Sequence, residues 1–254
     1  METAVIYIFF VILGACIGSF INVVISRLPH KGAFLSSSRS KCPSCNKTIR
    51  PYDLFPIISY IILLGKCRDC KTRVSLRYPL VEATGSVFAV MCVFFFGLTL
   101  LALMVYIVVM ILLAISLIDF DTMEIPNSLN LALILPAASA IWLLPDVTIT
   151  SHIIGFFSIS LPMLLLTLAI KGAFGGGDIK LMAVCGFLLG WELSLLAFFL
   201  ALLAGGGIAA FLLMSGRRKR GQHMVFGPAL CFGIVISLFF GSELIHLYLS
   251  LFWF

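Results

Sequence analysis

Long uninterrupted apolar runs constrain the fold of this chain more than any other feature of its sequence. Several of them reach the roughly 20 apolar residues that a helix needs to cross a hydrocarbon core about 30 Å thick. Of the 254 residues, 61% are hydrophobic and only 11% are charged, whereas soluble domains usually carry about 25% charge. The sequence therefore predicts an all-α polytopic membrane protein that sits in a lipid bilayer.

The apolar runs divide into eight expected membrane helices. They cover residues 4–25, 80–97, 99–118, 128–144, 152–170, 180–192, 194–214 and 224–250. With the N-terminus outside, this division places all 17 Lys and Arg residues in cytosolic connections, as the positive-inside rule requires. Fusing the sixth and seventh helices would separate the basic stretch at 217–220 from Lys171 and Lys180. The net charge of +6 thus follows from membrane topology and gives no indication of nucleic-acid binding.

One hydrophilic insert, residues 27–79, separates the first helix (1–26) from the remaining multi-helix domain (80–254). It contains two CxxC pairs, CPSC and CRDC. Two such turns can direct four thiolates at one tetrahedral centre, a ligand set typical of structural zinc. The alternative is disulfide bonding, which rarely persists in a reducing cytosol. We therefore expect a zinc ion bound by Cys42, Cys45, Cys67 and Cys70.

Two of the eleven acidic residues, Asp119 and Asp178, are expected at one cytosolic face, because the third and fifth helices both end there. Ionisable groups near a bilayer are costly and are functional candidates. Two carboxylates held close together share one proton, so one can take a proton from water while the other protonates a peptide carbonyl. Asp121 lies about 200° further around a continuing helix. We therefore expect Asp119 rather than Asp121 to face Asp178.

Three consecutive glycines precede Asp178 in the stretch AFGGGDIK at 173–180. Glycine lets the chain turn sharply and lets a substrate backbone approach closely, and it is tolerated at membrane depth beside a wet cavity. Two simpler interpretations stay open: Asp178 as the N-cap of the sixth helix, and DFDTME at 119–124 as an interfacial turn. The occurrence of both features at one expected face favours a functional site.

Several motifs follow one another in order along nearly the whole chain. They are GSFINVVISRLP at 18–29, the two CxxC pairs, YDLFPIISYIILLGKC at 52–67, SLRYPLVE at 75–82, IDFDTMEIPN at 118–127, GGGDIK at 175–180 and FGPAL at 226–230. In this combination they resemble the type IV prepilin peptidases, the bifunctional leader peptidases and N-methyltransferases of type IV pilus and type II secretion systems. The chain departs from many relatives in reading IPN where they read IPD, which leaves the acidic pair unaffected.

The resemblance implies a membrane aspartyl protease of the GxGD type. Asp119 and Asp178 match its catalytic pair, and Gly175 and Gly177 match the motif glycines. We expect Lys180 and Asp121 to support this site. The implied substrate is the short basic leader of a prepilin or pseudopilin, cut after a glycine at the cytoplasmic side of the bacterial inner membrane.

The intact four-cysteine motif further implies methylation of the new N-terminal residue, usually phenylalanine, from S-adenosylmethionine. The insert has no glycine-rich nucleotide fingerprint, so the site of this cofactor cannot be derived from the residues. Glu82 and Asp53 are candidates to contact the cofactor or the substrate amine. Salt bridges between these acids and the surrounding Arg and Lys are an equally good interpretation, and a peptidase without methyltransferase activity stays open.

Two rival functions come from other classes of protein. A transporter would use intramembrane carboxylates to relay ions, and it predicts polar residues deep within the spans and often repeated halves. A zinc-bearing membrane scaffold would leave Asp119 and Asp178 as solvated loop residues. The key acids at one face and the lack of an internal repeat favour the peptidase. The sequence leaves the oligomeric state and the particular pilin open.

Overall fold

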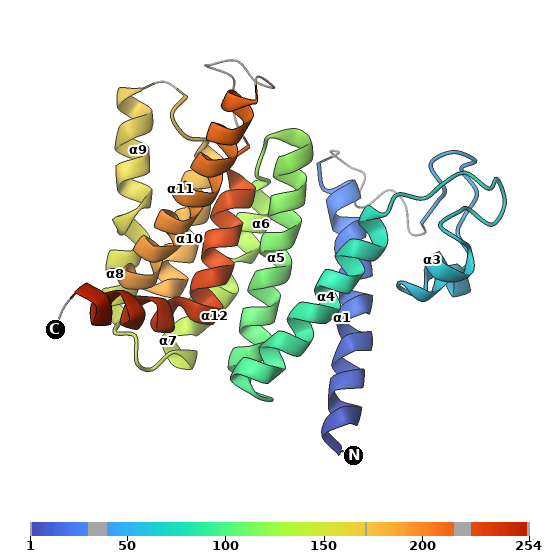
Figure 1. Ribbon diagram of the computed structural model, residues 1–254, viewed down its shortest axis with the longest axis horizontal. Helices are drawn as coiled ribbons and strands as arrows, with labels where there is room; N and C mark the ends of the chain where they lie inside the picture. The colour runs from blue at the N-terminus through green and yellow to red at the C-terminus, as the bar shows by residue number, and fades with distance from the viewer. Residues whose placement is uncertain (1, 30–39, 171, 216–224, 253–254) are drawn as a thin grey trace. The chain divides into compact units, whose positions relative to one another are not determined.

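The computed structural model describes residues 2–29, 40–170, 172–215 and 225–252 (Figure 1). Across these ranges the regular structure is helical, apart from two isolated β-bridges. Lys171 and the basic stretch at 217–220, on which the expected topology partly depends, lie outside them. The chain divides into two compact units, Met1–Ala102 and Leu103–Phe254.

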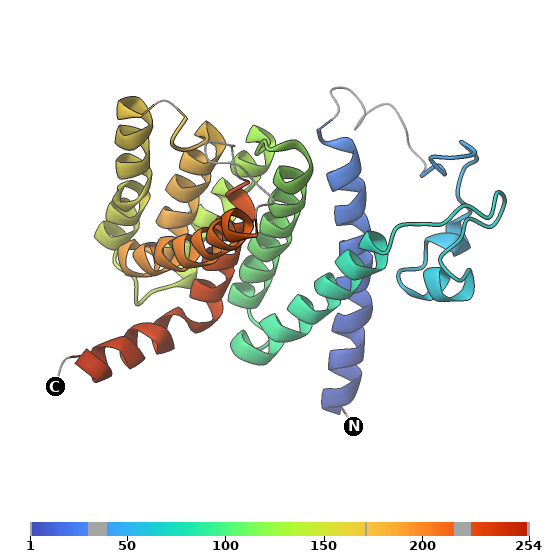
Figure 2. The ribbon, with the colours of Figure 1, turned by 45° about the horizontal axis from the view of Figure 1, so that its top comes forward.

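The first unit is built on two long helices, α1 (Glu2–Arg27) and α4 (Arg77–Phe96), which cross side by side in both views (Figures 1 and 2). Small residues let their backbones touch. A Cβ atom added to Gly14 would lie 2.5 Å from the Gly85 carbonyl oxygen, and one added to Gly18 would lie 2.7 Å from the Glu82 Cα atom. Such small-residue contacts are typical of helix pairs in membranes, where close packing replaces the hydrophobic drive.

The insert between these helices holds two cysteine turns, the 3-10 helix η1 (Pro51–Leu54) and the short helix α3 (Ile58–Ile62). The two cysteine turns have the same construction. A bridge between Lys41 and Thr48 closes the first, and a bridge between Lys66 and Arg73 closes the second. In each turn the first cysteine N–H donates to the carbonyl five residues on, at 3.0 Å in one and 2.9 Å in the other.

The second unit is a bundle of helices. They are α5 (Leu100–Thr122), α6 (Asn127–Ala132), α7 (Ile134–Leu143), α8 (Ile149–Ser158), α9 (Ser160–Ala169), α10 (Gly176–Leu189), α11 (Trp191–Met214) and α12 (Gly227–Phe252). Helix α10 packs against its neighbours from α6 to α12 (Figure 1). Leu181 and Met182 of α10 are fully buried, as are Leu112 and Ile115 of α5.

Each of the eight expected apolar segments contains helix, and six helical stretches are long and apolar enough to cross a membrane. The other two are shorter: the fourth segment is broken into α6 and α7, and the sixth corresponds to the 14-residue α10. The four-cysteine cluster lies between the first and second long helices. The prediction of an all-α polytopic membrane protein with an insert at this place is confirmed.

Candidate active site and metal centre

Asp119 lies in the last turn of α5 and is buried, with 5% of its surface exposed. The backbone N–H of Gly227, the first residue of α12, donates a hydrogen bond of 2.9 Å to the Asp119 Oδ2 atom. A Cβ atom at position 227 would lie 2.5 Å from that oxygen. Glycine is therefore the residue that lets the start of α12 approach the carboxylate this closely.

Asp178 lies in the first turn of α10 and is half-buried. Its Oδ2 atom accepts a hydrogen bond of 3.2 Å from the Gly175 N–H. Gly175 is itself the N-cap residue, so Asp178 reaches back to the N-cap from the third helical position. The carboxylate thus contributes to the start of α10, although Asp178 does not occupy the N-cap position that the simpler interpretation gives it.

The fold brings these two carboxylates together. Asp119 contacts Gly227 at the start of α12, Cys231 lies one turn further along α12, and α12 packs against α10, which carries Asp178. The three side chains therefore lie in one region, although α5, α10 and α12 are far apart in the sequence. An acidic pair in a largely buried region can hold one proton between its two members and serve as acid and base together.

The segment after α5 supports the glycine stretch. A Cβ atom at Gly177 would lie 2.8 Å from the Ile125 Cβ atom. The Asn130 side-chain amide donates to the Gly177 carbonyl at 3.4 Å, and the Lys180 ammonium donates to the Asn127 Oδ1 atom at 2.9 Å. These contacts hold the chain on both sides of Asp178 against the segment that follows α5.

Among the expected supporting residues, Lys180 makes this contact, while Asp121 is exposed in the last turn of α5. The sequence predicts no specific role for Gly227 or Asn130. Their only signals were the FGPAL motif and a polar residue inside an apolar helix. Asn130 is 4% exposed, and its Oδ1 atom has no hydrogen-bond partner within the described part of the chain.

The four cysteines of the insert form one cluster whose sulfur atoms all lie within 4.8 Å of one another. The Cys42 and Cys70 sulfurs are 3.8 Å apart, and all the cysteines are free thiols, so the disulfide alternative is not present. The Thr72 hydroxyl and backbone N–H lower the pKa of Cys70 to about 6. The backbone N–H groups of Cys45 and Ser44 lower the pKa of Cys42. Thiolates are the form of cysteine that binds metals.

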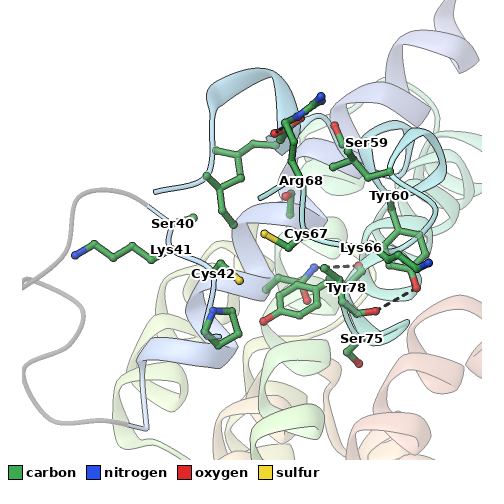
Figure 3. Close-up of a pocket in the computed structure, with 18 of the residues that line it drawn as sticks. Ser40, Lys41, Cys42, Ser59, Tyr60, Lys66, Cys67, Arg68, Ser75 and Tyr78 are labelled. Atoms are coloured by element: carbon green, nitrogen blue, oxygen red, sulfur yellow. Dashed lines mark hydrogen bonds and ion pairs between the residues drawn. The ribbon is translucent and has the colours of Figure 1, made fainter. Parts of the chain in front are cut away.

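A cavity of about 560 Å³ opens beside this cluster, between the cysteine turns, α3 and the adjoining ends of α1 and α4. Figure 3 shows Cys42 and Cys67 at its wall, with Tyr60 and Tyr78 nearby. Glu82 is buried there and accepts a hydrogen bond of 2.8 Å from the Ile57 N–H. Within the described part of the chain, Glu82 is therefore held by a backbone N–H and not by the salt bridge considered as an alternative.

Asp53 also lines this cavity, where it forms a bidentate ion pair with Arg68, with nitrogen–oxygen distances of 2.6 and 2.9 Å. The Arg68 guanidinium lowers the pKa of the Asp53 carboxyl. It also stacks over the Tyr52 ring, with its central carbon 5.4 Å from the ring centroid. The salt-bridge interpretation thus describes Asp53, and its carboxylate stays at the cavity wall.

Fold and site together define a polytopic membrane protein with a carboxylate pair in its helical bundle and a four-cysteine cluster in its insert. Comparison with known proteins identifies the family to which this membrane protein belongs. The type IV leader peptidase family matches residues 105–210, and the bacterial peptidase A24 N-terminal domain matches residues 12–96. The chain belongs to the type IV leader peptidase family.

Relatives of this family resemble the chain over nearly its full length. A prepilin leader peptidase/N-methyltransferase of Bacillus subtilis (strain 168) is 32% identical over 242 residues, which cover 94% of this chain and 96% of the relative. Proteins of the same name from Burkholderia pseudomallei (strain K96243) and Pseudomonas aeruginosa are 33% and 31% identical, over 92% and 94% of this chain and 85% and 92% of those proteins. No solved structure matches the chain.

Proposed function

We propose that this protein removes the short basic leader of type IV prepilins or pseudopilins and then methylates the new N-terminus. The names of its relatives support both activities. The observation that carries the peptidase proposal is that Asp119, held by Gly227 of α12, and Asp178, on the adjoining α10, lie in the same part of the second unit. The match of the bacterial peptidase A24 N-terminal domain to residues 12–96, together with the names of the relatives, extends the proposal to the methyltransferase.

In the proposed peptidase step, one carboxylate is ionised and the other is protonated. The ionised member takes a proton from water, and the resulting oxygen attacks the scissile carbonyl. The protonated member gives its proton to the carbonyl oxygen, and a later transfer to the leaving amine breaks the peptide bond. The Gly227 N–H holds one oxygen of Asp119 and the Gly175 N–H holds one oxygen of Asp178. Both groups are thereby oriented before the substrate arrives.

The proposed orientation has the N-terminus outside, and the insert and both aspartates at the cytosolic side of the bacterial inner membrane. The distribution of Lys and Arg supports it, since 11 of the 17 lie between residues 27 and 79. Membrane orientation follows the placement of these residues on the cytoplasmic side.

The donor chemistry of the insert fits a zinc ion. Four thiolates that converge within 4.8 Å match the distances of a tetrahedral sulfur site, in which zinc–sulfur bonds are about 2.3 Å long. Cys42, Cys45, Cys67 and Cys70 would hold the metal, and four protein ligands leave no position for a catalytic water. We therefore assign the metal a structural role, which stabilises an insert that is too small for a sizeable apolar core.

The cavity beside the cluster is the proposed site for S-adenosylmethionine, which would supply the transferred methyl group. Its volume of about 560 Å³ falls within the usual range for small-molecule sites, about 300–1,000 Å³. Glu82 and Asp53 present carboxylates at its wall that can accept hydrogen bonds from the amino group or hydroxyls of the donor, or from the substrate amine. The arginines on the same wall can contact its carboxylate.

A two-part assay tests the proposal. Cleavage of a prepilin-like peptide should fail in Asp119→Asn and in Asp178→Asn, because each variant removes one member of the acid–base pair. Methyl transfer from labelled S-adenosylmethionine to a precleaved peptide should survive in both variants, because the cavity lies in the other unit. Cleavage at the parental rate by either variant would refute the peptidase and favour a transporter or scaffold. Cleavage without methyl transfer in the parent would reduce the protein to a peptidase.

A further inference from the structure

A cluster of large apolar side chains surrounds helix α3 in the insert. Ile58, Ile61 and Ile62 share one face of the helix, since residues three and four apart are neighbours on its surface. Each of them is more than half exposed, and Leu64 is 82% exposed. The α3 apolar surface consists of Ile58, Ile61, Ile62 and Leu64, none of which lines the cavity beside the cysteines. An apolar surface of this kind marks an interaction site.

The level of α3 along α1 and α4 indicates what surrounds the α3 apolar surface. The residue before α3, Ile57, donates its N–H to Glu82, which lies five residues inside α4. Glu82 packs against Gly18, which lies nine residues before the end of α1. At 1.5 Å per residue, the start of α3 lies at a level about 13 Å along α1 from its C-terminal end and about 7 Å along α4 from its N-terminal end.

Both views agree with this depth, since they show α3 at the level of the middle of α1 rather than beyond its C-terminal end (Figures 1 and 2). The long helices expose apolar side chains at the same level. Phe20 of α1 and Leu80 of α4, each two residues from the Gly18–Glu82 contact, are 58% and 63% exposed. Because α1 and α4 are long and apolar enough to span a membrane, we expect these exposed apolar side chains to face lipid.

Polar groups lie behind α3 at this level. Ser19, Asn22 and Glu82 line the cavity on the side of α1 and α4. Such groups are costly when they face hydrocarbon without a partner. Asn22 donates to the Tyr78 carbonyl at 3.0 Å, and Ser59 of α3 is buried and donates inward to the Tyr52 carbonyl at 3.0 Å. Within α3, Ser59 and Tyr60 therefore line the cavity, whereas Ile58, Ile61 and Ile62 do not.

We propose that the α3 apolar surface is embedded in the bilayer leaflet on the insert side and contacts lipid acyl chains. On this reading α3 separates lipid from the polar wall of the cavity, and the insert is partly a membrane element rather than a wholly soluble domain. The cavity is then reached from the aqueous side. The proposal depends on the membrane topology of α1 and α4 and not on either proposed activity.

A γ-turn centred on Ile57 immediately precedes α3 and helps to fix the position of this helix. Ile57 has φ 60° and ψ −51°, and the Ile58 N–H approaches the Pro56 carbonyl at 2.5 Å. A γ-turn of this sign is rare and strained, most of all for a β-branched residue. The strained turn directs the Ile57 N–H at Glu82 immediately before α3 begins, so the surrounding contacts hold the start of α3 in this position.

Quenching of tryptophan fluorescence by lipids brominated on their acyl chains tests the proposal. The full chain is reconstituted in liposomes after its three natural tryptophans are changed to phenylalanine, and Ile61→Trp or Ile58→Trp is then introduced. Phe20→Trp, on α1 at the same level, is the lipid-facing reference. Thr48→Trp, an exposed position in the first cysteine turn, is the matched control. Parental elution in gel filtration and a parental helical circular dichroism spectrum show that each variant is folded.

We expect Ile61→Trp and Ile58→Trp to lose a share of their emission similar to that of Phe20→Trp, while Thr48→Trp keeps its emission. Equal emission of the α3 variants in brominated and ordinary lipid would overturn the proposal. Insensitivity to brominated lipid, together with a blue shift when a peptide with an apolar helix is added, would also overturn it. In that case the surface would be a docking site for protein.

Discussion

Replacing Gly227 tests whether its contact with Asp119 orients that carboxylate for catalysis. In Gly227→Ala, the added methyl group would lie 2.5 Å from the Asp119 Oδ2 atom, 2.9 Å from its Cγ atom and 3.2 Å from its Cβ atom. All three distances are shorter than ordinary van der Waals contacts. Asp119 is 5% exposed, so it has little room to rotate away without disturbing its neighbours. Either the carboxylate or the start of α12 must move.

Two effects set the magnitude. Overpacking a tight site costs about 1–3 kcal/mol, and loss of a hydrogen bond to a charged group costs about 1.5–3 kcal/mol. The catalytic effect should exceed the effect on stability, because a displacement of about 1 Å at reacting groups can reduce the rate about 10²-fold. We expect kcat for prepilin cleavage to fall about 10²-fold with little change in KM, while the protein still inserts in the membrane.

Initial cleavage rates over a range of peptide concentrations measure this effect. Gly206→Ala in α11 is the matched control, since it makes the same chemical change in a helix where a Cβ atom would meet nothing within 4 Å. We expect the control to keep the parental rate and to be slightly more stable, because alanine favours helix by about 1 kcal/mol over glycine. A parental rate in Gly227→Ala would refute the reasoning that this contact orients Asp119.

Three further predictions concern the glycine stretch, the acidic cluster and the metal centre. Gly177→Ala should impair cleavage because the added Cβ atom would lie 2.8 Å from the Ile125 Cβ atom, whereas the Cβ atom added in Gly176→Ala would meet nothing within 4 Å and should leave cleavage normal. Equal cleavage rates in the two variants would contradict this account. Asp121→Asn should keep much of the parental cleavage activity, because Asp121 is exposed. Complete loss of cleavage would show that Asp121, rather than Asp119, is the catalytic partner of Asp178. Metal analysis should find one zinc ion per parental chain and less zinc in Cys42→Ser, whose insert should also become more sensitive to protease. Cys16→Ser in α1 is the control, and a metal-free parent with full peptidase activity would count against the site.

Local signals made much of this architecture predictable. Apolar runs predicted the helices, and the CxxC spacing predicted the cysteine cluster because each pair is held within one tight turn. The same signals missed two breaks. The expected helix at 128–144 divides at Leu133, and the one at 152–170 divides at Ile159. Each break precedes a proline in the first turn of the next helix, where the missing N–H is tolerated.

Contacts between distant parts of the chain could not be predicted from the sequence in the same way. The hydrogen bond from Gly227 to Asp119 joins residues 108 positions apart and depends on how α12 packs against α5. The position of α3 depends on the contact between Ile57 and Glu82, which composition does not encode. Hydrophilic composition made the insert look wholly soluble, although its middle is a short apolar helix.

The separation of the Asp119 and Asp178 carboxyl groups in an experimental structure determined in a lipid bilayer tests the central claim most directly. The account predicts that a single hydrogen bond or one bridging water joins the two groups, with the Gly227 N–H still on Asp119. Carboxyl groups at opposite ends of the bundle, or divided by packed side chains, would contradict it.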